Sequence, residues 1–233
     1  MKIHRFIYPL KSEDKEISIQ DGALVKQFTK VLKLKAGEHV VLTDGAGLQS
    51  LCEIVDVKKK EVTLKVLDTK EKNTEGTAEK KVILYASVLK KENFEFIAQK
   101  ATEIGVAAIV PIISSRTIKT GLNETRLEKI IREATEQSGR STITHLFPAM
   151  DFEEALWHSL ENNDKTVLFD VTGNTPYETG NDIVGAFVGP EGGWSESEIS
   201  LARSSGAEVW SLGKYTLRGE TAAIIGAYVA LRN

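Results

Sequence analysis

The stretch Ile183-Val184-Gly185-Ala186-Phe187-Val188-Gly189-Pro190-Glu191-Gly192-Gly193-Trp194 passes from an apolar run into a turn of glycine and proline. The apolar half predicts a buried strand. The following residues, Ser195-Glu196-Ser197-Glu198, have the form of a capping box that opens a helix. In an open α/β sheet, ligands bind beyond the carboxyl ends of the strands, and a glycine turn lets the backbone approach them closely. We therefore predict a ligand loop at Gly189–Gly193, with a simple strand-to-helix turn as the alternative.

A second glycine-bearing loop has the same setting. It reads Leu212-Gly213-Lys214-Tyr215-Thr216-Leu217-Arg218-Gly219-Glu220-Thr221-Ala222-Ala223, between a strand predicted at Glu208–Leu212 and a helix predicted at Thr221–Leu231. Arg218 offers a planar, charged donor fork suited to phosphate or a polarised carbonyl. Glu220 and Thr221 are residue types that cap a helix start, so an ion pair in a capped loop is the alternative. Because both loops are expected at one sheet edge, together they favour a ligand site.

The two loops lack the marks of a polyphosphate site. The chain contains no G-x-x-x-x-G-K-[ST] phosphate loop, and Gly189–Gly193 does not match the G-x-G-x-x-G dinucleotide fingerprint. This loop also holds no lysine or arginine, and Glu191 would repel phosphate. The composition therefore favours a neutral or cationic ligand and weakens the case for a nucleoside-triphosphate enzyme.

Upstream of the loops, strand and helix patterns alternate. We expect strands over Val82–Val88, Ala107–Ile113 and Thr166–Phe169, and helices over Asn93–Ile104 and Glu124–Gln137. Such alternation indicates an α/β layer with a mainly parallel sheet. We assign residues 81–233 to this domain.

The first third of the chain has a different pattern. A polar stretch at residues 73–80 is typical of a linker. Before it, β-rich runs cover His39–Thr43, Leu51–Val57 and Val62–Leu67, and one helix is predicted near Ala23–Leu34. Short strands with a single helix predict a small β-barrel over residues 1–72.

Composition excludes several classes of protein. The 233 residues include 30 Lys and Arg against 33 Asp and Glu, a net charge of −3, and no apolar run is long enough to span a bilayer. No secretory signal follows the N-terminus. The single cysteine, Cys52, can form no internal disulfide and gives no support to a metal cluster. We expect a cytoplasmic protein with no metal and no membrane contact, and we assign none of its four histidines to catalysis.

Whole-chain charge disfavours nucleic acid, but the charge is unevenly distributed. Residues 1–72 carry 14 Lys and Arg against 11 Asp and Glu, whereas the remainder carries 16 against 22. The basic residues gather at Lys26, Lys30, Lys33 and Lys35, and again at Lys58–Lys60. Such asymmetry points to nucleic-acid contact. Taken alone, this feature is explained better by a solvated helix face and a lysine-rich hairpin turn.

The two loops, Gly189-Pro190-Glu191-Gly192-Gly193 and Leu212-Gly213 with Leu217-Arg218-x-Glu220-Thr221-Ala222, together resemble the RsmE family. These are small-subunit rRNA uridine-N3 methyltransferases of the SPOUT, or trefoil-knot, superfamily. The resemblance extends over nearly the whole chain, through the segments 1–6, 31–37, 96–106 and 136–140. The chain departs from the family pattern at Tyr215, where arginine is usual, at Thr216, where an aliphatic residue is usual, and at Gly219, where threonine is usual. Lys30 and Lys33 stand where arginine is frequent.

The resemblance implies a C-terminal α/β knot whose pocket holds S-adenosylmethionine. The cofactor-binding residues it implies are Leu168, Phe169, Gly189, Pro190, Glu191, Gly192, Gly193, Leu212, Gly213, Leu217, Arg218, Thr221 and Ala222. The reaction it implies is methyl transfer to N3 of uridine 1498 in 16S rRNA. That nitrogen is protonated at neutral pH, so a base or a cation that stabilises the uridine anion would lower the barrier. We assign the second role to Arg218, and either a base or a capping role to Glu220.

The N-terminal domain gains a role from the same resemblance. It is expected to be a PUA-like barrel that grips rRNA, with phosphate contacts at Arg5, Lys26, Lys30, Lys33 and Lys35. The implied partners are 16S rRNA in the assembled small subunit and a second copy of the chain. The last helix, rich in small residues over Ala222–Ala230, would pack against that copy or lie in the core. A non-catalytic RNA-binding or ribosome-assembly protein that keeps the fold is the alternative function.

Overall fold

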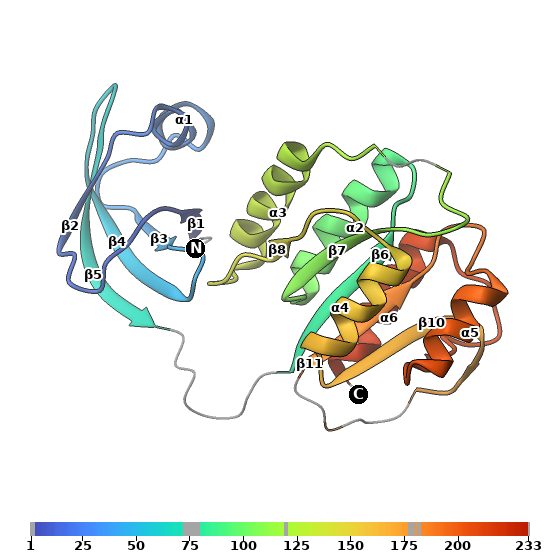
Figure 1. The fold of residues 1–233 in the computed structure, drawn as a ribbon. Helices are drawn as coiled ribbons and strands as arrows, with labels where there is room; N and C mark the ends of the chain where they lie inside the picture. Colours follow the sequence, from blue (N-terminus) through green and yellow to red (C-terminus); the bar gives the residue numbers. More distant parts are fainter. Residues whose placement is uncertain (1–2, 72–79, 119–120, 177–179, 181–182, 233) are drawn as a thin grey trace. The chain divides into compact units, whose positions relative to one another are not determined.

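The computed structural model describes residues 3–71, 80–118, 121–176, 180 and 183–232 of the chain (Figure 1). The chain divides into two compact units. The N-terminal unit comprises residues 1–74 together with 135–143, and the C-terminal unit comprises residues 75–134 together with 144–233. Apart from residue 80, the predicted linker at 73–80 lies outside the described residues.

The N-terminal unit is built on a five-stranded sheet with the order β1-β3-β4-β5-β2. Its strands are β1 (His4–Ile7), β2 (Glu16–Ile19), β3 (His39–Thr43), β4 (Leu48–Val57) and β5 (Val62–Glu71). The β1–β3 pair is parallel, and the other three pairs are antiparallel. The three strands predicted from the β-rich runs are present, and β2 was not predicted.

One interrupted helix covers the core of this sheet. It consists of α1 (Gly22–Lys26) and a π-helical turn, η1 (Gln27–Val31). The side chain of Asp21 caps α1 by accepting from the amide of Leu24 at 2.8 Å. Phe28 is fully buried, and its ring stacks on that of Phe6 with 4.3 Å between centroids. The helix predicted near Ala23–Leu34 is therefore present with Leu24 and Phe28 buried, although it ends before Leu34 and leaves Val31 exposed.

A segment distant in sequence completes the N-terminal unit. The amide of Ile7 donates to the carboxylate of Glu136 at 2.9 Å, and the hydroxyl of Thr43 donates to the carbonyl of Ser141 at 3.0 Å. The amide of Ile143 donates to the carbonyl of Gly45 at 2.8 Å. A single boundary near residue 72 therefore does not separate the two units.

The C-terminal unit is built on a seven-stranded sheet with the order β12-β10-β11-β6-β7-β8, in which β9 also pairs with β7. Its strands are β6 (Lys81–Ser87), β7 (Ala108–Ile113), β8 (His145–Leu146), β9 (Met150–Asp151), β10 (Lys165–Asn174), β11 (Ile183–Val188) and β12 (Glu208–Trp210). Every pair is parallel, which confirms the predicted sheet type.

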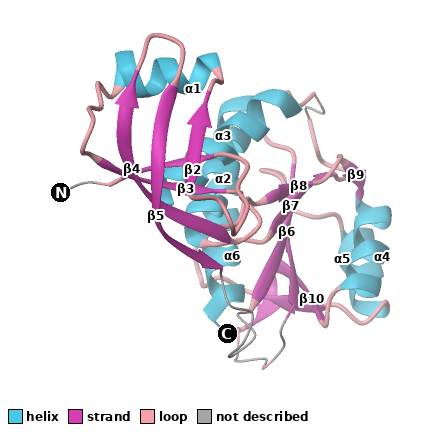
Figure 2. Ribbon diagram, turned by 90° about the vertical axis from the view of Figure 1, so that its left-hand side faces the viewer, coloured by secondary structure: helices cyan, strands magenta, loops and turns pink. Residues whose placement is uncertain are grey.

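Helices cover both faces of this sheet. They are α2 (Lys91–Ile104), α3 (Glu124–Ser138), α4 (Phe152–Asn162), α5 (Glu196–Ser204) and α6 (Gly219–Arg232). Figure 2 shows α4 and α5 on one face and α2 and α6 on the other. A hydrophobic core lies on each face of the sheet, and successive residues of β6 point into opposite cores. Leu84 belongs to the core with Phe94 of α2, whereas Tyr85 belongs to the core with Phe152 of α4.

Candidate active site

A pocket lies at the carboxyl ends of β10, β11 and β12, where three chain segments meet. Its empty space is about 650 Å³, open solvent included. Nine of the predicted cofactor residues line it: Phe169, Gly189, Pro190, Glu191, Gly193, Leu212, Gly213, Leu217 and Ala222. The structure thus brings the two predicted loops together. They meet although β10 separates β11 from β12 in the sheet.

The first loop has a rigid backbone. The amide of Gly193 donates to the carbonyl of Pro190 at 2.9 Å, and Gly193 has φ +67°, a conformation that favours glycine. A Cβ on Gly189 would lie only 3.1 Å from the indole of Trp194. That indole is buried and donates to the carbonyl of Phe169 at 3.1 Å. The glycines therefore let the loop fold over a buried tryptophan.

The predicted capping box at the start of α5 is present. Ser195 is the N-cap, and its side chain and that of Glu198 bond reciprocally to each other's backbone. The amide of Ser195 donates to Glu198 at 2.7 Å, and the amide of Glu198 donates to the Ser195 hydroxyl at 3.2 Å. The box holds the end of the first loop at a fixed place on the helix.

The second loop is held by Ser211. Its amide donates to the carbonyl of Asn174 at 2.7 Å, and its hydroxyl lies 3.2 and 3.3 Å from the carbonyl and amide of Gly213. Gly213 has φ +124°, which side chains rarely tolerate. At Gly219 an added Cβ would lie 2.9 Å from a methyl of Leu89. A larger residue here would therefore require the Leu89 side chain to shift.

The charge of the pocket suits a cation without phosphate. Among its described lining residues, Asp170 and Glu191 are the charged ones, and no lysine or arginine lines it. The Asp170 carboxylate accepts bonds from the amide and hydroxyl of Thr172, at 2.8 and 2.6 Å. Apolar surface comes from Val188 and Leu217. A sulfonium compound that carries an adenine ring fits this combination of acidic, glycine-rich and apolar walls.

Four predicted cofactor residues do not line the pocket: Leu168, Gly192, Arg218 and Thr221. Leu168 is fully buried in the core of the sheet. The Arg218 side chain is 86% exposed, and its Nη1 lies 3.7 Å from the Glu220 carboxylate, which is 14% exposed. The ion pair foreseen in the capped-loop alternative is thus present, and it leaves the guanidinium largely in solvent.

The pocket also has lining residues that were not predicted as cofactor-binding: Asp170, Val171, Val188, Trp194, Tyr215, Thr216 and Gly219. All of them lie within or beside the predicted loops and strand ends. The two-loop pattern located their neighbourhood but could not say which side chains turn inward.

A third loop braces the first one. The amide and hydroxyl of Ser115 donate to the Glu198 carboxylate at 2.9 and 3.1 Å. Next to it, Nη1 of Arg116 donates to the carbonyl of Gly192 at 2.8 Å, and its aliphatic stem packs over that glycine. These residues follow β7, more than 70 positions before the loop that they support. No local sequence signal marks them.

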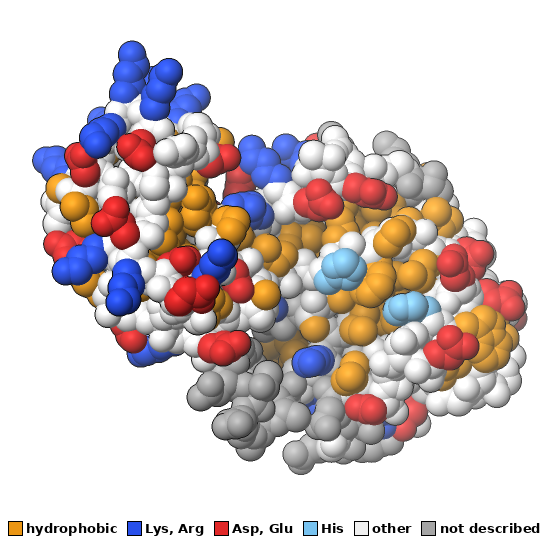
Figure 3. Space-filling model, turned by 60° about the vertical axis from the view of Figure 1, so that its left-hand side comes forward, with side chains coloured by type: hydrophobic (Ala, Val, Ile, Leu, Met, Phe, Trp, Pro, Cys, Tyr) orange, Lys and Arg blue, Asp and Glu red, His pale blue; other side chains and the backbone are white. Residues whose placement is uncertain are grey.

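The N-terminal unit exposes the predicted basic residues. Lys26, Lys30, Lys33 and Lys35 are all exposed and lie along or just after α1 and η1. Within the described part of the chain none of them forms an ion pair. Figure 3 shows lysine and arginine side chains gathered at one end of this unit, the end at which the tip of the β4–β5 hairpin lies in Figure 1. Arg5, on β1, is exposed too, and its guanidinium lies against Gly139.

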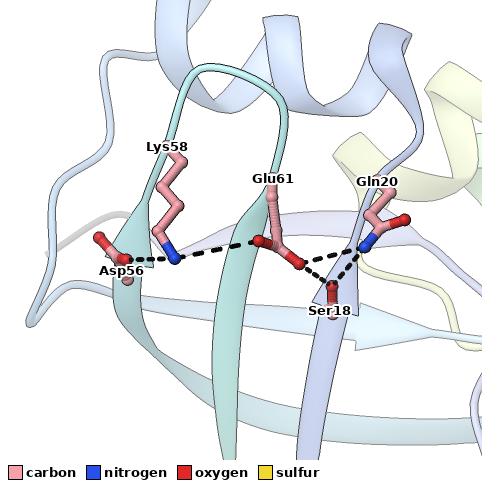
Figure 4. A network of polar contacts seen from close by, with 5 residues as sticks. All are labelled: Ser18, Gln20, Asp56, Lys58 and Glu61. Atoms are coloured by element: carbon pink, nitrogen blue, oxygen red, sulfur yellow. Dashed lines mark hydrogen bonds and ion pairs between the residues drawn. The ribbon is translucent and has the colours of Figure 1, made fainter.

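Of the hairpin lysines, Lys58 differs from these in having partners. Lys58 lies 3.3 Å from Asp56 and 4.0 Å from Glu61 (Figure 4). Glu61 also accepts from Ser18 at 2.6 Å and from Gln20 at 3.1 Å, and these hydrogen bonds lower its pKa. Lys58 therefore pairs with carboxylates of its own hairpin, which agrees with the alternative of a lysine-rich hairpin turn.

Comparison with known proteins decides the family. Residues 77–230 match the model of an RNA methyltransferase domain, and residues 28–67 match that of an RNA methyltransferase PUA domain. The chain belongs to the RNA methyltransferase family.

This RNA methyltransferase is 26% identical over 221 residues to the ribosomal RNA small subunit methyltransferase E of Bacillus subtilis, with 87% of this chain and 85% of that protein covered. It is 27% identical over 237 residues to the same enzyme of Rickettsia conorii, with coverages of 96% and 93%. Its fold resembles the crystal structure of ribosomal RNA small subunit methyltransferase E from Neisseria gonorrhoeae bound to S-adenosyl methionine. That match has 28% identity, a TM-score of 0.84, and coverages of 97% and 95%. The predicted resemblance and the SPOUT-type fold with a PUA-like domain are confirmed.

Two further observations concern the described residues only. They include no helix long and apolar enough to cross a membrane. They also include no group of three His, Cys, Asp or Glu side chains placed to hold a metal ion.

Proposed function

We propose that this RNA methyltransferase transfers a methyl group from S-adenosylmethionine to N3 of uridine 1498 in 16S rRNA, acting in the cytoplasm on the assembled small subunit. The observation that carries the proposal is the junction of the two glycine loops at one acidic pocket whose described lining residues include no lysine or arginine. The names of the relatives support the substrate class, since they are small-subunit rRNA methyltransferases. The cofactor in the Neisseria gonorrhoeae structure supports the methyl donor.

The residues of the pocket fit the donor. Gly189, Gly193 and Gly213 let a ligand approach the backbone closely because they carry no side chain, and Leu212 and Leu217 offer apolar surface to the adenine ring. Asp170 and Glu191 suit the positive sulfonium. When bound, S-adenosylmethionine supplies an electrophilic methyl group. The protein contributes by holding the acceptor in line with it, which lowers the entropic part of the barrier.

The acceptor nitrogen needs help because it carries a proton at neutral pH. In our proposal the exposed guanidinium of Arg218 binds O2 or O4 of the uracil and stabilises the anion that forms when the proton leaves. Glu220 lies 3.7 Å from Arg218 and is the nearest described carboxylate paired with it. It orients the guanidinium and is our candidate for the group that takes the proton.

Methylation of defined subunits tests the proposal. Purified protein, labelled S-adenosylmethionine and small subunits that lack 3-methyluridine are incubated, and the rRNA is digested and analysed by mass spectrometry. We expect a single new 3-methyluridine at position 1498. Label at another nucleotide would overturn the site specificity. Absence of both label and calorimetric binding of S-adenosylmethionine would instead favour a non-catalytic assembly protein.

Arg218 permits a sharper prediction. We expect Arg218→Ala to lower the rate of methyl transfer about 100-fold, the usual effect of losing one donor to a developing oxyanion. The Kd for S-adenosylmethionine should change little, because the guanidinium does not line the pocket. Single-turnover kinetics and calorimetry measure the two quantities. Arg218→Lys keeps the charge but loses the planar donor fork. Its rate of methyl transfer should lie between those of the wild type and Arg218→Ala. Equal losses of rate and cofactor affinity would mean that Arg218 shapes the pocket.

The proposal also includes binding of rRNA by the N-terminal unit. The exposed Arg5, Lys26, Lys30, Lys33 and Lys35 contact rRNA phosphates, so affinity for the subunit should fall steeply with salt.

We also propose a homodimer. In α6 the small residues Ala223, Ala227 and Ala230 are buried in the core of this chain, whereas Ile225 and Tyr228 are exposed. Light scattering of the purified protein tests the dimer, and a monomer at micromolar concentration would contradict it.

A further inference from the structure

Tyr215 has an unusual place beside the pocket. It lines the pocket, yet it is 72% exposed, whereas the other two aromatic side chains of the lining, Phe169 and Trp194, are buried. It therefore belongs to the rim rather than to the wall. A ring with so much surface in solvent has area left for a second molecule.

The surroundings of this ring are cationic. Nζ of Lys214 lies 4.9 Å from the centroid of the Tyr215 ring. Three residues further along, Arg218 exposes most of its guanidinium. The base of the loop is held by the bonds of Ser211 to Asn174 and Gly213. An exposed aromatic ring with a lysine over it and an exposed arginine three positions along the same braced loop is a pattern with which proteins bind unpaired nucleotides, since the ring stacks on a base and the cations contact phosphates.

The proposed reaction requires such a platform. N3 lies on the pairing edge of uracil, so the base must leave its stack before the nitrogen can reach a methyl donor inside the pocket. Resting on the proposed function, we infer that Tyr215 is the surface on which the unstacked acceptor uracil lies, with Lys214 holding an adjacent phosphate.

Four variants of the full-length protein test the inference. Tyr215→Phe keeps the ring and should retain the KM for small subunits that lack 3-methyluridine. Tyr215→Leu and Tyr215→Ala should raise this KM roughly 10- to 100-fold, the range for the loss of one base–aromatic stack. The Kd for S-adenosylmethionine should stay within about twofold of the wild-type value in all three variants. Lys214→Ala should raise the KM less and weaken its dependence on salt.

A matched control comes from α2. Phe96 is also an exposed aromatic residue beneath a lysine, with Nζ of Lys100 5.7 Å from its ring centroid, but it does not line the pocket. Phe96→Ala should leave the KM unchanged, and an equal rise in this variant would overturn the platform. The platform would also be overturned if Tyr215→Leu had the same KM as Tyr215→Phe, or if the Kd for S-adenosylmethionine rose as much as the KM. Wild-type protein that binds S-adenosylmethionine but methylates no subunit would overturn the proposed function first, and the platform with it.

Discussion

Lys33 is the one non-glycine residue with a left-handed backbone in the described part of the chain, at φ 54°. It follows η1, and the amide of Leu34 donates to the carbonyl of Phe28 at 2.9 Å. This is the closing bond of a Schellman-type helix end, whose left-handed position usually holds glycine because a Cβ is strained there. Strain of this kind is retained where a side chain has a use. Its presence at a proposed phosphate contact agrees with that role.

Replacing Lys33 should therefore change the free energy of unfolding and the affinity for the small subunit in opposite directions. We expect Lys33→Gly to raise the free energy of unfolding by about 1 kcal/mol, since it removes the strain, and to weaken binding to the small subunit. Urea unfolding and filter binding measure the two effects. Lys33→Ala is the matched control, because it removes the same charge but keeps the Cβ. It should lose affinity without gaining stability, and a gain in the alanine variant would argue against strain.

Cys52 makes stability depend on pH. It is fully buried in β4, and burial raises the pKa of its thiol from 9.0 to about 11. Unfolded chains release this proton at the lower pKa, so the contribution is complete below about pH 8.5 and is lost as the pH rises towards 11. We expect a loss of about 2–3 kcal/mol across that interval. Urea unfolding of wild type and Cys52→Ala should give curves that converge as the pH rises, and parallel curves would contradict the expectation.

At the scale of elements, the start of α5 depends on one buried carboxylate. Glu198 accepts from the amide and hydroxyl of Ser195 and from the amide and hydroxyl of Ser115, all within 3.1 Å. We expect Glu198→Ala to lower the free energy of unfolding by about 1–2 kcal/mol, because it removes the cap and the acceptor that joins Ser195 to Ser115. The Kd for S-adenosylmethionine should rise as well, since the Gly189–Gly193 loop leads into this cap.

The neighbouring Glu196 provides the control for this prediction. It also lies in the first turn of α5 but is exposed. Glu196→Ala should change the free energy of unfolding by less than about 0.5 kcal/mol. Thermal unfolding followed by circular dichroism compares the two variants. Similar losses would mean that general helix-dipole effects, rather than the braced carboxylate, stabilise the element.

Elements with strong local patterns were predicted well. β3 and β11 have the predicted bounds, and the capping box of α5 forms as expected. α4 was missed although its signals are present: Asp151 caps it, and Phe152, Ala155, Leu156 and Ser159 recur at helical spacing on its buried side. β2 has only four residues at a sheet edge, too few for a clear period. β12 ends two residues early because the Ser211–Gly213 turn follows it.

At the scale of the whole molecule, sequence located the pocket but not everything that supports it. Parallel strands end at a common edge, so two loops after two strands were enough to predict that the loops meet at one pocket. Arg116 reaches Gly192 from a third loop only in the folded chain, and no spacing rule links them. The same holds for the N-terminal unit, which takes residues 135–143 from beyond the predicted boundary. Contacts between distant segments are properties of the tertiary fold, which local patterns do not encode.

That borrowed segment leads to a prediction for the N-terminal unit. Glu136 accepts the amide of Ile7 at 2.9 Å, so Glu136→Ala removes a hydrogen bond to a charged acceptor, at a cost of about 1–3 kcal/mol. Amides of β1 and β3 should then exchange with solvent roughly tenfold faster or more, whereas those of β10 and β11 keep their protection. Hydrogen exchange with mass spectrometry resolves both regions. Glu136→Gln retains an acceptor oxygen and should stay close to wild type. Equal acceleration in β1 and β11 would show that the two units open together, and that their separate cores do not make them independent in stability.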